Sequence, residues 1–439
     1  MLTEVEIKFA VNGNLQARLA SFLQDYAKEG ESRTVTLLNT YYDTPNRLLR
    51  QHHFGLRTRE VHSEGNVSLI EMTLKSEGRV VGGLHSRPEY NVALTSAQID
   101  LALLPADIWP QSCQPAEIAA QLHPLFTTNF DRTIYLVNVG DSVIELAYDR
   151  GEIRADEAVA PINEVELELK SGELADLLTF ARALSAVGDV RLFDESKAKR
   201  GYQLSEGSLV MELSPFTVPS VKAKATVEDA LITLAEHLLR YWQMQESAWL
   251  AGHKQGAEGV RFALSATRQL FTLFGGIIPR KASHELRAEL IALENAVQEA
   301  SDAESFCYQP AVSRVKLMLM QWLAQKQWQQ FVRADKRQKL TASFKRFADT
   351  HLSRYRHELK TLMQEANSHQ AFLDKATALE QGVISLVLLA GAYPQEASQA
   401  YVGAWLALLE CIEHHDNDKR QKLLQEAINQ PTFWLTSTN

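Results

Sequence analysis

The stretch Glu4-Val5-Glu6-Ile7-Lys8 alternates charged and apolar residues. In a β-strand, residues i, i+2 and i+4 lie on one face, so its three charged side chains would point together while Val5 and Ile7 point the other way. By itself this pattern indicates only an amphipathic strand with its charges in water. What it means for the fold depends on whether other strands repeat it.

Seven further strands are predicted in the first 200 residues from period-two alternation and β-branched content. With the first strand, their ranges are 3–10, 34–43, 54–61, 68–75, 84–92, 129–138, 142–153 and 163–170. Several of them gather charged residues on one face, namely Arg57 with Arg59, Glu71 with Lys75, Glu145 with Asp149, and Glu164, Glu166 and Glu168 with Lys170, beside the isolated Arg87 and Arg132. Solubility does not require such clusters, whereas a ring of strands with a charged interior and an apolar exterior does.

The predicted fold class is therefore α+β. Residues 14–29 and 173–187 have the i, i+3, i+4 apolar spacing of helices that would flank an antiparallel, eight-stranded, tunnel-like β-barrel. Pro215 and Pro219 then precede a Leu-, Ala-, Gln- and Glu-rich region whose periodicity predicts an all-α helical bundle. We expect a tunnel domain, a linker and a helical domain over residues 1–203, 204–222 and 223–439.

The charge of the chain is unevenly distributed. Its net charge of -9 belongs to residues 1–200, which hold 20 Lys or Arg against 29 Asp or Glu, while residues 201–439 hold 25 of each. An acidic first half argues against a specific or nonspecific nucleic-acid surface there, because such a surface needs positive potential. Binding of a small anion through a metal ion remains open.

Three features predict a cytoplasmic protein that does not enter a membrane. The three cysteines, Cys113, Cys307 and Cys411, are far apart and form no Cys-x-x-Cys pair. The first residues lack the basic and apolar regions of a signal peptide. The most apolar run, residues 382–393, is shorter than the roughly 20 residues that span a bilayer.

A charged interior of this kind suits phosphoryl transfer. A triphosphate carries several negative charges, and the transition state of its hydrolysis is stabilised mainly by positioning and opposing charge. Arg and Lys would hold the phosphates. Carboxylates beside them would repel the phosphates unless a hard cation such as Mg²⁺ or Mn²⁺ lay between, so the pairing of Glu rows with Arg rows predicts metal dependence.

The motifs resemble those of the CYTH superfamily, the triphosphate tunnel metalloenzymes, over about residues 1–203. The resemblance depends on their order more than on any one of them. Glu-x-Glu-x-Lys at residues 4–8 is followed by Arg57-Thr58-Arg59, Thr73-Leu74-Lys75, Asp149-Arg150-Gly151, Glu164-Val165-Glu166 and Ser196-Lys197-Ala198-Lys199-Arg200-Gly201-Tyr202.

The resemblance implies a role for each matching residue. The catalytic residues would be Glu4, Glu6 and Lys8. The phosphates would be held by Lys8, Arg57, Arg59, Lys75, Arg87, Arg132 and Lys197. The metal ion, Mg²⁺ or Mn²⁺, would be bound by Glu4, Glu6, Asp149, Glu164 and Glu166. Glu145 and Glu168, which share a face with these residues, either support the ligands or are simply solvated.

The helical region narrows the choice of substrate among the activities of the family. A CYTH unit followed by such a region resembles the bacterial CYTH-CHAD inorganic triphosphatases, which implies hydrolysis of inorganic triphosphate to diphosphate and phosphate by in-line attack of water. Two alternatives remain, because the fold alone does not choose a substrate. They are an organic triphosphatase acting on thiamine triphosphate or a nucleoside triphosphate, and a noncatalytic polyphosphate-binding scaffold.

CHAD domains are associated with polyphosphate binding through basic helix faces, so the resemblance also makes polyphosphate an expected partner of the helical region. The helix that would carry this face, near residues 258–269, keeps few basic positions. Residues 314–360 instead hold 12 Lys or Arg against three acids. This segment either binds a polyanion or is a solvated helix face.

Overall fold

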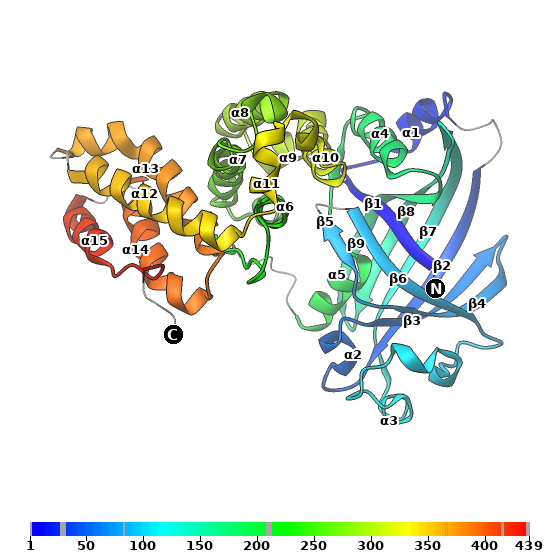
Figure 1. The fold of residues 1–439 in the computed structure, drawn as a ribbon. Helices are drawn as coiled ribbons and strands as arrows, with labels where there is room; N and C mark the ends of the chain where they lie inside the picture. Colours follow the sequence, from blue (N-terminus) through cyan, green and yellow to red (C-terminus); the bar gives the residue numbers. More distant parts are fainter. Residues whose placement is uncertain are drawn as a thin grey trace. The chain divides into compact units, whose positions relative to one another are not determined.

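The computed structural model describes residues 2–26, 32–81, 84–207, 213–364, 366, 368–413 and 417–435. The chain divides into two compact units. The strand unit comprises Met1–Glu212 together with Ser301–Gln321, and the helical unit comprises Leu213–Ala300 and Trp322–Asn439. Figure 1 shows long curved strands in the first unit and packed helices in the second.

Ten strands of the strand unit form one antiparallel sheet that closes on itself (Figure 1). Their bounds are β1 Leu2–Val11, β2 Ser32–Asp43, β3 Gly55–Ser63, β4 Asn66–Lys75, β5 Arg79–Val81, β6 Leu84–Ala93, β7 His123–Val139, β8 Ser142–Ala155, β9 Ala158–Ser171 and β10 Val190–Leu192. Eight of them follow the ring in the order β1-β9-β8-β7-β2-β3-β4-β6, and pairing of β6 with β1 closes it. The expected tunnel-like ring of eight antiparallel strands is confirmed.

Alternation explains why these segments form the ring. On β1, Glu6 and Lys8 face the interior cavity, whereas Ile7 and Phe9 point outward and are fully buried. The outer face is covered in part by α4, Leu174–Ser185, which packs on β7, β8 and β9. In the described part of residues 1–212, the α-helices are α1 Gln16–Leu23, α2 Leu48–Gln51, α3 Pro115–Ala119, α4 Leu174–Ser185 and α5 Lys197–Ser205.

The periodicity of the sequence does not predict every element of the strand unit. β5 and β10 contain three residues each, which is too few for alternation to be recognised. β7 begins at His123, ahead of the predicted start at residue 129, and carries Pro124 beside a register shift against β2, where a missing N–H is tolerated. α5 is also additional, and its N-cap is Ser196, whose hydroxyl accepts a hydrogen bond from the Lys199 amide at 3.1 Å.

A segment from the second half of the chain belongs to the strand unit. It contains α9, Ala303–Cys307, and most of α10, Pro310–Ala324. The Ser313 hydroxyl donates a hydrogen bond to the Val190 carbonyl at 3.2 Å and accepts one from the Leu192 amide at 3.0 Å. α10 therefore occupies backbone groups of the edge strand β10 that would otherwise lack partners.

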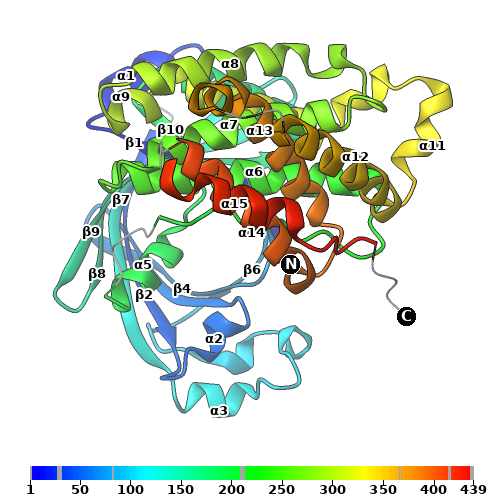
Figure 2. The same ribbon diagram turned by 90° about the vertical axis from the view of Figure 1, so that its left-hand side faces the viewer.

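The helical unit is all-α, as expected. Its main helices are α6 Val227–Leu250, α7 Gly256–Leu273, α8 His284–Glu299, α11 Arg337–Leu340, α12 Phe344–Gln364, α13 His369–Ala390, α14 Gln395–Glu413 and α15 Asn417–Asn429. In Figure 2, α12, α13 and α14 follow one another as packed neighbours. Within the described ranges, no helix has both the length and the hydropathy of a membrane span.

Replacing Gly201 with Ala should destabilise the strand unit. A Cβ at this position of α5 would come within 2.1 Å of the Phe126 ring. That ring cannot move easily, because it is buried and stacks on Tyr41 with ring centroids 4.6 Å apart. We expect a loss of about 1–3 kcal/mol, measured by calorimetry.

Gly403→Ala is the matched control in the helical unit. Gly403 lies inside α14 with nothing near its Cβ position, so the same substitution should stabilise by about 0.5–1 kcal/mol. A Gly201→Ala protein as stable as the wild type would contradict the close packing of α5 on β7.

Candidate active site

The ring encloses a charged cavity of about 800 Å³. Ten Lys or Arg and nine Asp or Glu residues line it, contributed by the strands of the ring, by the segment between β4 and β5, and by the segments around α2 and α5. Ten of the twelve residues expected at the site face this cavity, namely Glu4, Glu6, Lys8, Arg57, Arg59, Lys75, Arg87, Arg132, Glu166 and Lys197. The other two, Asp149 and Glu164, are almost completely buried behind them.

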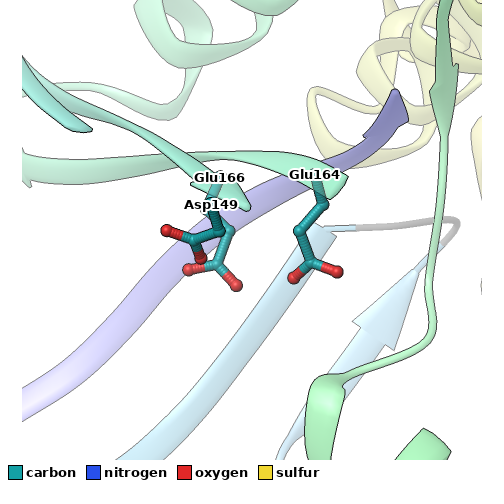
Figure 3. A group of neighbouring side chains, drawn as sticks. All are labelled: Asp149, Glu164 and Glu166. Carbon is teal, nitrogen blue, oxygen red and sulfur yellow. The ribbon is translucent and has the colours of Figure 1, made fainter. Parts of the chain in front are cut away.

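Three expected metal-binding carboxylates form one group, which we call the acid cluster. Asp149, Glu164 and Glu166 offer oxygen atoms that lie within 4.8 Å of one another (Figure 3). Asp149 on β8 is the direct cross-strand partner of Glu164 on β9, and Glu166 follows two residues later on the same face. The antiparallel register therefore brings together residues that are far apart in the chain.

Cations of the chain neutralise the acid cluster. The Lys197 ammonium, carried in by α5, donates to Asp149, Glu164 and Glu166 at 2.6, 2.5 and 3.0 Å. Arg132 on β7 forms a two-point pair with Asp149, both N–O distances being 2.7 Å, and also contacts Glu166. Burying carboxylates away from water is costly, and this pairing offsets the cost.

Lys8 joins this network from β1. Its ammonium lies 2.5 Å from Glu166 and 3.1 Å from Glu6. Burial disfavours the charged form, but Glu166, Glu6 and Glu164 outweigh it, so the pKa of Lys8 is raised well above its usual value. Burial alone would likewise raise the pKa of Glu166, yet Lys197, Lys8 and Arg132 hold it well below the usual range.

A second group of cations is paired much more loosely. Arg57 and Arg59 share the inner face of β3, and their nearest carboxylates, Glu89 and Glu71, are 3.7 and 3.6 Å away. Burial and the neighbouring guanidinium groups of Arg57 and Arg132 lower the pKa of Arg59 to about 10. Like charges held this close favour an anion between them.

Lys75 and Arg87 complete the expected phosphate-binding set. The Lys75 ammonium lies 2.5 Å from Glu4 and 3.4 Å from Glu89. Arg87 is the cross-strand partner of Glu4 and faces the cavity. Among the side chains that the structure describes, none forms an ion pair with Arg87, so its guanidinium is available to a ligand.

Sequence reasoning missed several lining residues. Glu89 and Asn91 on β6 face the cavity with Arg87, and Tyr41 on β2 lies beside Arg57, its hydroxyl accepting a hydrogen bond at 3.5 Å. The i, i+2 spacing from Arg87 could have identified the first two. Glu145 and Glu168, whose role was left open, both line the cavity as well.

Replacing Glu166 with Gln should reduce stability at neutral pH by about 3–5 kcal/mol, because buried cations would lose a partner. The folded-state pKa of Glu166 is depressed, so its ionised form contributes stability that is present above the ordinary value of 4.5 and is lost as the pH falls through the folded value. The urea midpoint of the wild type should therefore fall more steeply below pH 4.5 than that of the variant.

Glu152→Gln serves as the control, since Glu152 pairs with Arg154 at an exposed position. Its urea midpoint should follow the wild type at every pH. An acid transition of equal steepness in Glu166→Gln and the wild type would show that Glu166 is not linked to folding in this way.

Comparison with known proteins identifies a relative that matches about half of this chain. A Haemophilus influenzae protein named inorganic triphosphatase is 39% identical over 204 residues, which are 46% of this chain and 55% of that protein. The chain thus spans about half the length of this relative.

The solved structures that match this chain have lower sequence identity to it. A Hippeastrum adenylyl cyclase candidate with a dominant triphosphatase activity is 16% identical, and the match covers 47% of this chain and 97% of that one at a TM-score of 0.33. The CHAD domain of Ricinus communis is 18% identical, and the match covers 49% of this chain and 90% of that one at a TM-score of 0.34. Both scores are below 0.5, so the fold rests on the strand order described above.

Family models match both parts of the chain. Residues 2–202 match the model of the CYTH domain, and these residues include the whole charged ring. Residues 233–425 match the model of the CHAD domain. The chain therefore contains a CYTH domain followed by a CHAD domain.

Proposed function

We propose that the strand unit hydrolyses inorganic triphosphate to diphosphate and phosphate with the help of Mg²⁺ or Mn²⁺. The observation that carries this proposal is the charge of the enclosed cavity. Its ten bases and nine acids leave a net charge near +1, and the buried Asp149 and Glu164 behind them bring the sum to about -1, whereas a triphosphate carries several negative charges. A divalent cation between the carboxylates and the phosphates would supply the missing positive charge.

The available ligands fit such a cation. The acid cluster provides three oxygen donors close together, and Mg²⁺ and Mn²⁺ prefer oxygen ligands. Glu4 and Glu6 add cavity-facing carboxylates from β1. When bound, such an ion neutralises phosphoryl oxygens and lowers the pKa of a coordinated water. Lys197 contacts all three acids of the cluster, so a cation held by the same three would compete with its ammonium for their oxygen atoms.

The basic residues of the chain would then bind and orient the phosphates. Arg57 and Arg59 are only loosely paired, so their guanidinium groups keep donors for phosphate oxygens. Arg87 faces the same cavity. Cations fixed in this way stabilise the charge that spreads over the transferring phosphoryl group, and they do so without reorganising during the reaction. Water attacks in line with the departing diphosphate.

The aromatic residues of the cavity favour an inorganic over an organic triphosphate. Tyr41 stacks on Phe126, Phe54 packs against Trp109, and the Tyr202 ring lies beneath Arg50. Phe130 is covered by Arg132 and Lys197. These lining rings are already packed against other side chains, so they do not offer a free platform for thiamine or a base.

A noncatalytic polyphosphate scaffold is a poorer fit for the same cavity. Carboxylates next to a bound anion weaken its binding unless a cation intervenes. Nine acids line this cavity, and a protein that only bound polyphosphate would gain affinity by losing them.

Phosphate release from tripolyphosphate, ATP and thiamine triphosphate, each with and without Mg²⁺ or Mn²⁺, tests the activity. The wild type should act fastest on tripolyphosphate and lose activity when the metal is chelated. Glu4→Ala and Lys8→Ala should each lower kcat by about 10²–10³-fold, because each removes a charge that faces the reacting group.

Arg154→Ala is the control for this series, since Arg154 is exposed and pairs with Glu152 outside the cavity. It should retain wild-type kcat. Full activity of Glu4→Ala would refute the tunnel mechanism. Faster release from ATP than from tripolyphosphate would refute only the choice of substrate.

We also propose that polyphosphate binds the helical unit at a pocket of about 450 Å³ beside α12. Its lining includes Arg356 and Lys360, next to the polar residues Asn429 and Thr432. Burial and the nearby Arg356 lower the pKa of Lys360, so an anion here would relieve repulsion. By contrast, the exposed bases Lys345 and Arg354 pair with Asp349 and Glu358 one turn away, as expected of a solvated face.

The double variant Arg356→Gln, Lys360→Gln should weaken polyphosphate binding to the full chain by about tenfold or more, measured by calorimetric titration at fixed salt. Lys345→Gln, at a paired and exposed position, should bind like the wild type. Equal loss in both proteins would indicate a diffuse electrostatic surface and not this pocket.

A further inference from the structure

A histidine on the inner face of the ring, beneath the residues that line the cavity, takes no part in the site described so far. His85 on β6 is the cross-strand partner of Glu6, just as Arg87 is the partner of Glu4. Directly opposed residues share a face, and Glu6 and Arg87 both line the cavity. The His85 side chain therefore points into the ring, where it is 99% buried beneath the lining residues.

The His85 ring has no hydrogen-bond partner among the described residues. Both Nδ1 and Nε2 are buried and unpaired in this part of the chain. Burial, together with the nearby charges of Lys8 and Arg87, lowers the pKa of His85 well below its usual value, so the ring is neutral. A neutral imidazole presents one N–H donor and one acceptor nitrogen.

Two unpaired polar atoms at this depth destabilise the fold, because they have given up hydrogen bonds to water. A histidine retained only for packing would be expected to bond to a carbonyl or carboxylate nearby. An apolar side chain of similar volume would fill the space without the penalty. The arrangement makes sense if the partner of His85 is a component that enters the cavity with the substrate.

The charges around His85 indicate what that component is. Three of the four charged groups that act most strongly on the ring are cations, namely Lys8, Arg87 and Lys75, and the fourth is the carboxylate of Glu166. Glu6 lies opposite His85 on β1. An anion is attracted to such surroundings. His85 does not itself line the cavity, so a direct contact with the anion is not expected. A bridging water fits this separation, since water can accept from the imidazole N–H and donate to a phosphoryl oxygen.

We infer that His85 is a positioning residue that holds a water molecule at the inner wall of the cavity and through it orients bound triphosphate. This inference rests on the proposed function for its kinetic consequences. Its consequences for stability and for anion binding do not depend on turnover.

Two variants at His85 separate this role from a structural one. His85→Leu fills the space without polar atoms, and His85→Gln keeps a donor and an acceptor. We expect His85→Leu to lower kcat for tripolyphosphate by about 10–100-fold, as loss of a water-mediated hydrogen bond to a charged ligand would. His85→Gln should recover most of that loss. In the absence of ligand, the melting temperature of His85→Leu should equal or exceed that of the wild type.

His62→Leu is the matched control. His62 is a partly exposed histidine of β3 that contacts Glu60 at 3.2 Å and does not line the cavity. It should leave kcat at the wild-type level. The melting temperature of each protein is also measured with tripolyphosphate in metal-free buffer, and the increase caused by the anion should be smaller in His85→Leu than in the wild type and in His62→Leu.

Several results would overturn the inference. A lower melting temperature of ligand-free His85→Leu would assign His85 to the structural core. Unchanged kcat in His85→Leu, or equal loss in the Leu and Gln variants, would exclude positioning by hydrogen bonds. A wild type that does not hydrolyse any triphosphate would refute the proposed function alone. In that case an equal tripolyphosphate-induced shift in the wild type and His85→Leu would refute the role of His85 as well.

Discussion

The arrangement of the strand unit depends on one buried interaction, the contact of the Lys197 ammonium with the acid cluster. Asp149, Glu164 and Glu166 come from two neighbouring strands, and their mutual repulsion in a nearly water-free interior would open the ring if nothing opposed it. Lys197 contacts all three, and Arg132 and Lys8 add pairs from β7 and β1. Removing one member of such a buried network leaves the remaining charges unpaired in an interior of low dielectric constant. The stability that each member contributes therefore depends on the others.

The same network divides the cavity into two sides with different chemistry. Around the acid cluster, cations and carboxylates approach within 2.5–3.0 Å and nearly compensate each other. Around Arg57 and Arg59, the corresponding distances exceed 3.5 Å, and positive charge is left over. In the function proposed above, a phosphate chain with its cation would lie across this boundary, with the ion bound by the carboxylates and the phosphoryl oxygens by the guanidinium groups. The difference between the two sides of the cavity follows from the distances between cations and carboxylates and not from the number of charges.

Much of the ring could be predicted from the sequence because its signal is local. Alternation on a strand places every second side chain on one face, so Glu4, Glu6 and Lys8 could be assigned to a common surface without knowledge of the fold. β5, β10 and α5 were missed for the opposite reason. Three residues carry no measurable period, and α5 is polar along most of its length. Lys197 was found only through the resemblance of its surrounding motif.

The sequence by itself determined which side chains share a face and that the first half of the chain has a charged interior, because strand geometry repeats every two residues. Only the tertiary structure decided which charges meet. The register of β8 against β9 sets Asp149 opposite Glu164, and closure of β6 on β1 sets His85 opposite Glu6. The docking of Ser313 on β10 joins a distant helical segment to the ring. Such pairings depend on register, closure and burial across long separations in the chain, and a local pattern contains no information about them.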